Sequence, residues 1–299
     1  MIMQTIDGIP FPLEEPCDLS FLSAWGRVFQ VFSQNDSGNV SFGVQGKNGR
    51  FFIKVAGAKT IHACVPPDRA VEILRAAVPL YRELTHPKLI RLLDHFSHDR
   101  LYGAVFQWAE GECLFDHWNF DRYAATGELP PRDRFRGLPV EEKLDAFAEV
   151  FDFLTHVENR GYAAVDFYDS SLLYDFTQKQ LTICDIDLFR PRPLVNTQGP
   201  DYPGTKRLKA PEEYLLGAEI TPATGVFTLG ALLFHFFGSY TQEELQQMYR
   251  ENRFFPCRRE TWQLSPKRYA IALKAADPVP LRRYPSLKDF RRDWESDLT

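Results

Sequence analysis

Cysteine is scarce in this sequence, and its spacing is not that of a disulfide framework. Five cysteines are scattered over 299 residues, and none belongs to a Cys-x-x-Cys pair. An odd number of isolated cysteines is typical of a reducing compartment, whereas small secreted proteins pair theirs. The first twenty residues lack a basic stretch followed by an apolar one, and Pro10, Pro12 and Pro16 interrupt them. We therefore expect a cytoplasmic protein.

Long apolar runs and an excess of positive charge are also missing. The longest apolar run, around residues 230–237, is too short to span a bilayer. The formal net charge of −5 argues against a general binder of nucleic acid or of anionic membranes. The hydrophobic content of 44% and charged content of 25% are those of a globular protein of one large or two moderate domains. The composition predicts no nucleic-acid partner and no membrane partner.

Strand patterns dominate the first hundred residues. After an irregular lead-in at residues 1–25, apolar alternation and the turn signal Asn48-Gly49 indicate an antiparallel meander. Pro66-Pro67-Asp68 is typical of a helix start with Asp68 as N-cap, and the helix that follows has one apolar stripe. The sequence therefore predicts one helix and about five strands, at 28–32, 40–44, 50–55, 90–96 and 101–107.

Helical periodicity dominates the rest. Residues 108–112 are typical of a connector, 120–138 of an irregular insertion, and 190–209 of a long loop rich in proline. In that loop, Lys206, Arg207 and Lys209 favour either a solvated charged surface or a preference for acidic peptides. Apolar residues at three- and four-residue steps predict an amphipathic helix from Val140 to Leu154. Further helices are predicted at 224–237, 241–251, 266–276 and 287–296, and the whole is an α+β arrangement.

Four aspartates flank a predicted β-hairpin formed by residues 172–174 and 181–184. Asp166 and Asp169 precede the hairpin, and Asp185 and Asp187 follow it. An antiparallel pair brings its outer ends together, so these carboxylates are expected to converge. Converging carboxylates repel one another, and their clustering favours a metal site or proton transfer. The alternative is a polar rim on a surface hairpin.

Seven partial motifs follow one another in a set order. They are Ser33–Val40, Phe51-Phe-Ile-Lys54, Leu101–Glu112, Ala164-Val-Asp166, Asp185-Ile-Asp187, Gly204-Thr205 with Ala210-Pro-Glu212, and Asp277-Pro with Arg283-Tyr-Pro-Ser286. Their order resembles the glycine-rich loop, Val-Ala-Ile-Lys, hinge, His-Arg-Asp, Asp-Phe-Gly and later motifs of the protein-kinase-like fold. The resemblance implies one bilobal kinase-like domain with an N-lobe at 26–108 and a C-lobe at 109–299. The last two motifs resemble protein kinases rather than small-molecule kinases.

The resemblance implies transfer of the γ-phosphate of ATP, with Mg²⁺, to a Ser or Thr hydroxyl of an unknown protein substrate. It makes Asp166 the candidate base for the attacking hydroxyl and Asp185 the Mg²⁺ ligand. Lys54 would contact the α- and β-phosphates. An unpaired ammonium is costly to bury in an apolar strand, although an edge-strand lysine facing water is the alternative.

The same resemblance implies residues around the nucleotide and one structural ion pair. Glu112 would bond the ribose, or be only a solvated hinge residue. The backbone of Phe106 to Trp108 would meet the adenine edge. The faces of the ring would be lined by Val40, Val105 and Leu173. Glu212 and Arg283 would form a buried structural pair.

The sequence also departs from the pattern of that family. Only Gly38 remains of the three loop glycines, and Phe52 replaces a small residue over the adenine. Tyr168 replaces the loop lysine. Ser171 replaces the asparagine that binds a second metal, a loss for which Asp187 is a candidate substitute.

Two further departures concern regulation and the support of the catalytic loop. Val165 replaces the arginine that reads a phosphorylated activation loop, so we expect no switching of that kind. Gly225 replaces an aspartate that braces the loop. The partner of Lys54 is either Glu72 or no residue, because a second count along the chain points to Ala77.

Three functions are consistent with these observations. The first is an atypical Ser/Thr protein kinase that retains Lys54, Asp166 and Asp185. The second is a pseudokinase that binds a nucleotide or a partner, which Phe52 and Ser171 favour. The third is a small-molecule phosphotransferase.

Overall fold

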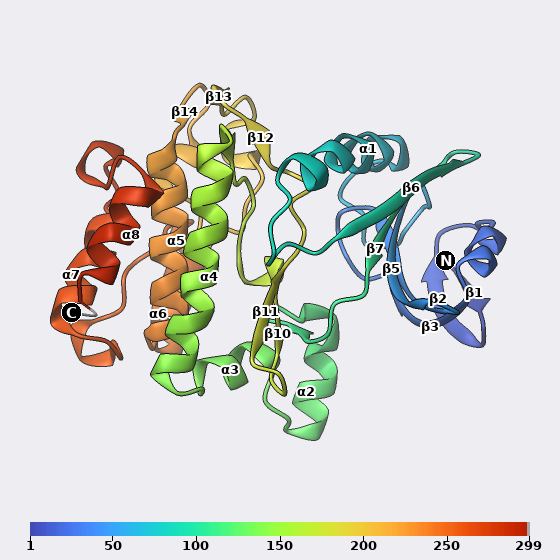
Figure 1. Ribbon diagram of the computed structural model, residues 1–299, viewed down its shortest axis with the longest axis horizontal. Helices are drawn as coiled ribbons and strands as arrows, with labels where there is room; N and C mark the ends of the chain where they lie inside the picture. The colour runs from blue at the N-terminus through green and yellow to red at the C-terminus, as the bar shows by residue number, and fades with distance from the viewer. Residues whose placement is uncertain (298–299) are drawn as a thin grey trace. The chain divides into compact units, whose positions relative to one another are not determined.

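The computed structural model describes residues 1–297 and divides the chain into two compact units. Unit 1 consists of residues 1–110 and 117–125, and unit 2 of residues 111–116 and those from 126 onward. Unit 1 is rich in strands and unit 2 in helices (Figure 1). The predicted α+β class is therefore confirmed.

An antiparallel sheet with the strand order β3-β4-β5-β7-β6 is the centre of unit 1. The helix α1 (Pro67–Glu83) packs on this sheet (Figure 1). The predicted meander, the two later strands and the single helix are thus confirmed. The strands of the sheet are β3 (Arg27–Phe32), β4 (Asn39–Gly46), β5 (Gly49–Ala56), β6 (Leu92–His98) and β7 (Leu101–Gln107).

The expectation of an irregular lead-in was wrong. Residues 1–13 form a hairpin of β1 (Ile2–Ile6) and β2 (Ile9–Leu13), with Asp7 at a φ of 49° in the turn. The prolines of β2 alternate with Phe11 and Leu13, which are buried in one core with the sheet. Proline is tolerated in such a two-stranded ribbon because no further strand needs its missing N–H.

The start of α1 also differs from the prediction. Pro66 occupies the N-cap position, and no side chain caps the helix. Asp68 lies in the first turn instead, where a carboxylate interacts favourably with the helix dipole. Pro79 lies inside the helix without ending it.

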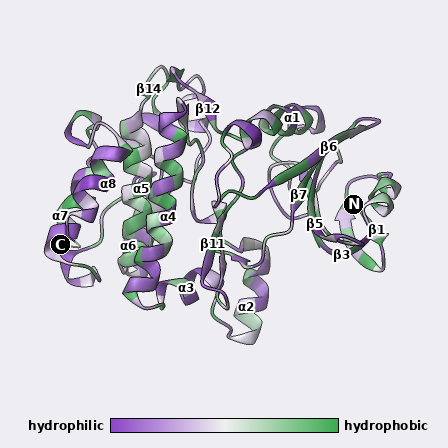
Figure 2. Ribbon diagram, in the orientation of Figure 1, coloured by the Kyte–Doolittle hydropathy of each residue, from purple (hydrophilic) through white to green (hydrophobic). Residues whose placement is uncertain are grey.

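Unit 2 is built around the apolar helix α5, which contacts α4, α7 and α8. Figure 2 shows hydrophobic colour along much of α5, and nearly all its residues from Val226 to Phe237 are buried. The helices of unit 2 from residue 140 onward are α4 (Val140–Asn159), α5 (Pro222–Phe237), α6 (Gln242–Glu251), α7 (Pro266–Ala275) and α8 (Leu287–Glu295).

Residues 120–138 are not the irregular insertion that was expected. They form α2 (Phe120–Thr126) and α3 (Pro131–Arg136). Pro131 occupies the first turn of α3, where its missing N–H costs nothing, so this proline starts a helix rather than breaking one.

The remaining strands of unit 2 are short. The predicted hairpin is confirmed as β10 (Leu172–Asp175) and β11 (Gln180–Ile183), and β8 (Glu112–Cys113) pairs with β10. The others are β9 (Tyr162–Ala163), β12 (Arg190–Pro191), β13 (Leu194–Val195) and β14 (Glu219–Ile220). Within residues 1–297, the helices are all too short or too polar to cross a membrane.

Candidate functional site

Three of the four aspartates that flank the β10–β11 hairpin, Asp166, Asp169 and Asp185, lie near Tyr168 in unit 2. The Cys184 N–H donates to the Ser171 carbonyl at 2.9 Å, so the pairing continues beyond both strands toward these acids. Asp166 has a φ of 61° and Asp185 a φ of 56°. Non-glycine residues adopt this left-handed conformation rarely, and it is concentrated at turns and functional sites. No pattern in the sequence predicts this backbone conformation.

The Tyr168 hydroxyl interacts electrostatically with two of these acids, Asp166 and Asp185. Burial raises the pKa of the Tyr168 hydroxyl far above its usual value, and the negative charges of Asp166 and Asp185 raise it further. The hydroxyl also has a hydrogen bond with the Ser170 side chain. A neutral phenol therefore lies within electrostatic reach of both carboxylates, at the position where the resemblance implies a lysine.

The two other predicted metal ligands lie deeper. Ser171 is fully buried, and its Oγ accepts a long hydrogen bond from the Tyr168 N–H at 3.5 Å. Asp187 is 6% exposed, whereas Asp185 is exposed. Among residues 1–297 no three His, Cys, Asp or Glu side chains are arranged as a ready-made metal site. The predicted ligands themselves offer only oxygen atoms, from two carboxylates and one hydroxyl, and oxygen is the type of ligand that Mg²⁺ prefers.

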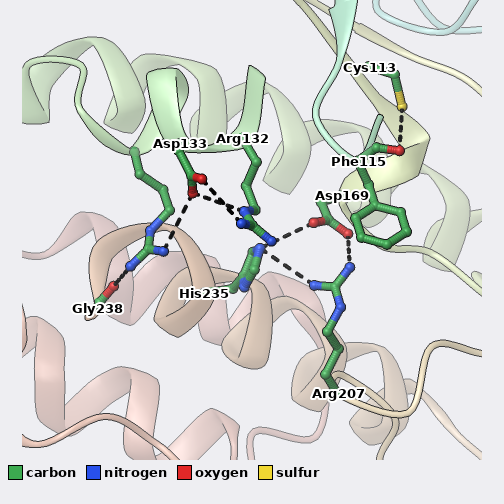
Figure 3. Close-up of polar contacts among 9 residues, drawn as sticks. Cys113, Phe115, Arg132, Asp133, Asp169, Arg207, His235 and Gly238 are labelled. Atoms are coloured by element: carbon green, nitrogen blue, oxygen red, sulfur yellow. Dashed lines mark hydrogen bonds and ion pairs between the residues drawn. The ribbon is translucent and has the colours of Figure 1, made fainter. Parts of the chain in front are cut away.

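Asp169 is the centre of a buried polar cluster that the sequence did not reveal (Figure 3). Its carboxylate is fully buried and accepts from Arg207 Nη2 at 2.6 Å. His235 Nε2 lies 3.1 Å from the other carboxylate oxygen. Although burial alone would raise it, the charge of Arg207 lowers the pKa of Asp169 to about 2. Burial lowers the pKa of His235 to about 4, so its ring is neutral at pH 7.

The basic residues of the 204–209 segment are mostly not on a solvated surface. Arg207 is 9% exposed and Lys209 is 4% exposed, and only Lys206 is exposed as expected. Lys209 Nζ donates to the Tyr202 carbonyl at 2.6 Å and to the Pro200 carbonyl at 3.2 Å. The expectation of a solvated charged loop was therefore wrong for two of its three members, because each has buried oxygen partners.

The structural pair implied by the resemblance is confirmed. Arg283 donates from its two terminal nitrogens to Glu212 at 2.6 and 2.9 Å, and both side chains are buried. Thr224 also donates to the Glu212 carboxylate, at 2.8 Å. Val165 forms an apolar cluster with Tyr202 and Ile220.

A small cavity in unit 2 adjoins residues 163–165, which immediately precede Asp166. It has room of about 30 Å³ and is lined by residues 163–165, by Gly225 of α5 and by the carboxyl-bearing Glu158 and Glu213. A cavity needs roughly 10–15 Å³ for one water, so this one accommodates about two. Burial raises the pKa of Glu213 to about 7.

In unit 1, Lys54 lies on a sheet face that carries several aromatic rings. Phe52 is two residues along β5 and therefore on the same face. Its ring lies 5.9 Å from that of Phe32 and 6.3 Å from that of Phe106. Phe32 in turn contacts Trp118 at 6.0 Å. The rings form an aromatic cluster (Phe32, Phe52, Phe106 and Trp118) next to the predicted phosphate-binding lysine.

The hinge end of this face is also filled by rings. Gly43 pairs with Phe52, and a Cβ at Gly43 would lie 2.8 Å from the ring of Phe29 and 2.9 Å from that of Trp108. The Trp108 N–H donates to the Arg50 carbonyl at 3.1 Å. This backbone group, predicted to meet adenine, is therefore already bonded within unit 1.

Two residues expected to line the adenine lie on the opposite face of the sheet. Val40 pairs with Val55 and Val105 with Ile53, so all four share the face that Lys54 does not. Both Val40 and Val105 are fully buried in the core that includes the N-terminal hairpin. The structure thus does not bring them together with Lys54, and Phe106 occupies the Lys54 face instead. Matching motifs along the sequence did not predict the face of Val40 and Val105, because a shift of one residue in a strand moves a side chain to the other face of the sheet.

The other predicted contacts have identifiable neighbours. Glu72 is exposed and accepts from Arg69 at 2.7 Å, so the structure shows it bonded to a residue other than Lys54. Glu112 forms an ion pair with Arg134 of α3 and is half-exposed. Leu173 is half-buried in β10, opposite Cys113.

The loop in the position of the glycine-rich motif packs on its own unit. The Asp36 carbonyl accepts from the Cys64 N–H at 2.8 Å. Gly38 has a φ of 75°, and a Cβ added there would lie 3.2 Å from the Ala70 side chain on α1. The residues before α1 and its first turn therefore hold this loop.

Comparison with known proteins supports a kinase-like family. No protein-family model matches the sequence. The chain is 26% identical over 155 residues to the serine/threonine-protein kinase nekl-2 of Caenorhabditis elegans. The alignment covers 50% of this chain and 42% of that protein, so the chain matches less than half of its relative's length.

Proposed function

We propose that this chain is a kinase-like phosphotransferase that transfers the γ-phosphate of ATP to a Ser or Thr hydroxyl of a protein. The observation that supports this most is the pair Asp166 and Asp185. Both have left-handed backbone, and both act electrostatically on the Tyr168 hydroxyl. We further propose that residues 26–108 and 109–299 are the two lobes of one kinase-like domain, to which the N-terminal hairpin adds a packed extension.

The proposed chemistry assigns one role to each retained residue. The acceptor oxygen forms a bond to the γ-phosphorus while the bond to the β–γ bridging oxygen breaks, and ADP leaves. Asp166 accepts the proton of the hydroxyl. Lys54 holds the α- and β-phosphates. Asp185, with Asp187 or Ser171, would hold Mg²⁺, which neutralises phosphate charge when bound.

A pseudokinase is the second candidate, and the aromatic cluster in unit 1 favours it. Phe52 lies against Phe32 and Phe106 on the face of Lys54. Rings packed there reduce the space for an adenine. In that case the chain binds a nucleotide weakly, or a protein partner, without transfer.

Phosphate transfer from labelled ATP to a Ser/Thr peptide library, with Mg²⁺ or Mn²⁺, distinguishes these candidates. We expect incorporation by the unaltered protein and a loss of at least about 100-fold in Asp166→Asn. Asp201→Asn, an exposed aspartate of the same unit, is the matched control and keeps full activity. Equal incorporation with and without Asp166, or none with either metal, contradicts transfer. Thermal stabilisation by Mg-ATP that disappears in Lys54→Ala then supports the second candidate.

A further inference from the structure

The buried cluster around Asp169 joins three segments that are far apart in the sequence. Asp169 belongs to the 166–171 loop, Arg207 to the 204–209 segment and His235 to α5 (Figure 3). The guanidinium of Arg207 also lies 4.7 Å from the ring centre of Phe115. Hydrogen bonds of Asp169 thus connect the loop that carries Asp166 to the 204–209 segment and to α5.

The contact between Arg207 and Asp169 is a buried ion pair. The Arg207 and Asp169 side chains are 10% and 0% exposed, so neither has bulk water as an alternative partner. A buried ion pair need not stabilise a fold, but removal of one member leaves an uncompensated buried charge. Burial and the charges of Arg207 and Arg132 all lower the pKa of His235, so its ring is neutral. The positive charge that contacts Asp169 is therefore that of Arg207.

The composition of the 166–171 loop explains why a cation from another segment contacts it. The sequence Asp166-Phe-Tyr-Asp-Ser-Ser171 contains two acids and no base. An ordered loop of this kind needs cations from elsewhere. Burial lowers the pKa of the Lys209 ammonium, whereas the charge of Glu213 and, to a smaller extent, that of Asp166 raise it. The 204–209 segment therefore supplies two positive charges near this loop.

We propose that Arg207 is a positioning residue for Asp166, acting through Asp169 and His235. This proposal rests on the proposed transfer function. Arg207 contacts no reacting atom. It holds the 166–171 loop in the arrangement in which Asp166 has its left-handed backbone.

Hydrogen exchange measured by mass spectrometry tests the positioning without any need for activity. In Arg207→Met, which keeps the length of the side chain, we expect exchange in peptides covering 164–172 to rise at least about tenfold. Arg268→Met is the matched control, because Arg268 is also buried and forms an ion pair with Asp297. It removes a buried guanidinium from α7 and leaves exchange in 164–172 unchanged. Arg207→Lys restores most of the protection.

Kinetics give the second readout. If the unaltered protein transfers phosphate, Arg207→Met lowers kcat about 100-fold and changes KM for ATP by less than about threefold, because a misplaced base slows chemistry more than binding. Faster exchange in 164–172 without measurable transfer by the unaltered protein overturns the proposed function but supports the positioning. Unchanged exchange in folded Arg207→Met overturns the positioning. Should Arg207→Met not fold, Asp169→Asn is judged by the same exchange criterion.

Discussion

The two units hold their predicted site residues by different physical means. In unit 1, Lys54 shares its sheet face with the aromatic cluster of Phe32, Phe52, Phe106 and Trp118. In unit 2, the loop that carries Asp166 is held by buried charges, chiefly Asp169 with Arg207. Ring packing tolerates substitution and gradual change of shape, whereas a buried ion pair tolerates little change in either partner.

The residues of the proposed phosphotransfer site are therefore supported differently in the two units. Unit 2 retains the acids in an unusual backbone conformation and adds ion pairs that support them. Unit 1 retains the lysine but fills the space beside it. The contrast predicts that variants in unit 2 chiefly lose stability, and that variants in the aromatic cluster gain access for a ligand.

The largest effect is expected from the buried pair of unit 2. Arg283→Met leaves the Glu212 carboxylate buried without its two guanidinium donors and with only the Thr224 hydroxyl bonded to it. We expect a loss of about 4 kcal/mol in the free energy of unfolding, measured by urea denaturation. Arg291→Met, which breaks exposed pairs with Asp152 at 2.9 Å and Glu295 at 2.7 Å, is the control and costs less than about 1 kcal/mol. Similar losses in the two variants would remove the basis of the comparison.

A smaller loss with a gain of binding is expected in unit 1. Phe52→Ala removes one ring from the aromatic cluster, at a cost of about 3 kcal/mol in stability. It also opens space beside Lys54. Thermal stabilisation by Mg-ATP therefore increases relative to the unaltered protein, whereas Phe42→Ala on the opposite face loses stability without that gain. A Phe52→Ala protein with no added response to Mg-ATP contradicts the role assigned to the ring.

The third effect appears only at neutral and higher pH and concerns Glu213, whose pKa burial raises from 4.5 to about 7. The folded state therefore binds the proton more tightly than the unfolded state. This stabilisation is complete below pH 4.5 and is lost as the pH rises through 7. Glu213→Gln, whose amide oxygen accepts from the Ala210 N–H as Glu213 does at 2.7 Å, is expected to be about 3 kcal/mol more stable at pH 8. Parallel stability curves for the two proteins between pH 5 and 8 would refute this.

The order of elements was predictable because hydrophobic periodicity determines it. The five-stranded sheet, the β10–β11 hairpin and the Glu212–Arg283 pair all followed from spacing or from the resemblance. The β1–β2 hairpin did not, because its prolines were interpreted as breakers although they occupy a ribbon that tolerates them. Val40 and Val105 were assigned to the wrong face, because motif alignment does not determine the parity of a strand.

The cluster around Asp169 was out of reach of the sequence for a different reason. His235 lies in a very apolar helix, and Arg207 is one of several basic residues in a loop rich in proline. Nothing in either local pattern indicates that the two meet one carboxylate. Such contacts depend on how three segments pack, which single-sequence patterns do not record.

The cavity beneath residues 163–165 makes this part of unit 2 sensitive to hydrostatic pressure. Pressure favours the state of smaller volume, and unfolding or hydration of a void reduces the volume of the system. Gly225 lines the cavity on the side of α5, where an added Cβ would lie 3.7 Å from the Leu287 side chain. Compression therefore loosens the backbone that leads into Asp166 before it affects the close-packed helices around α5.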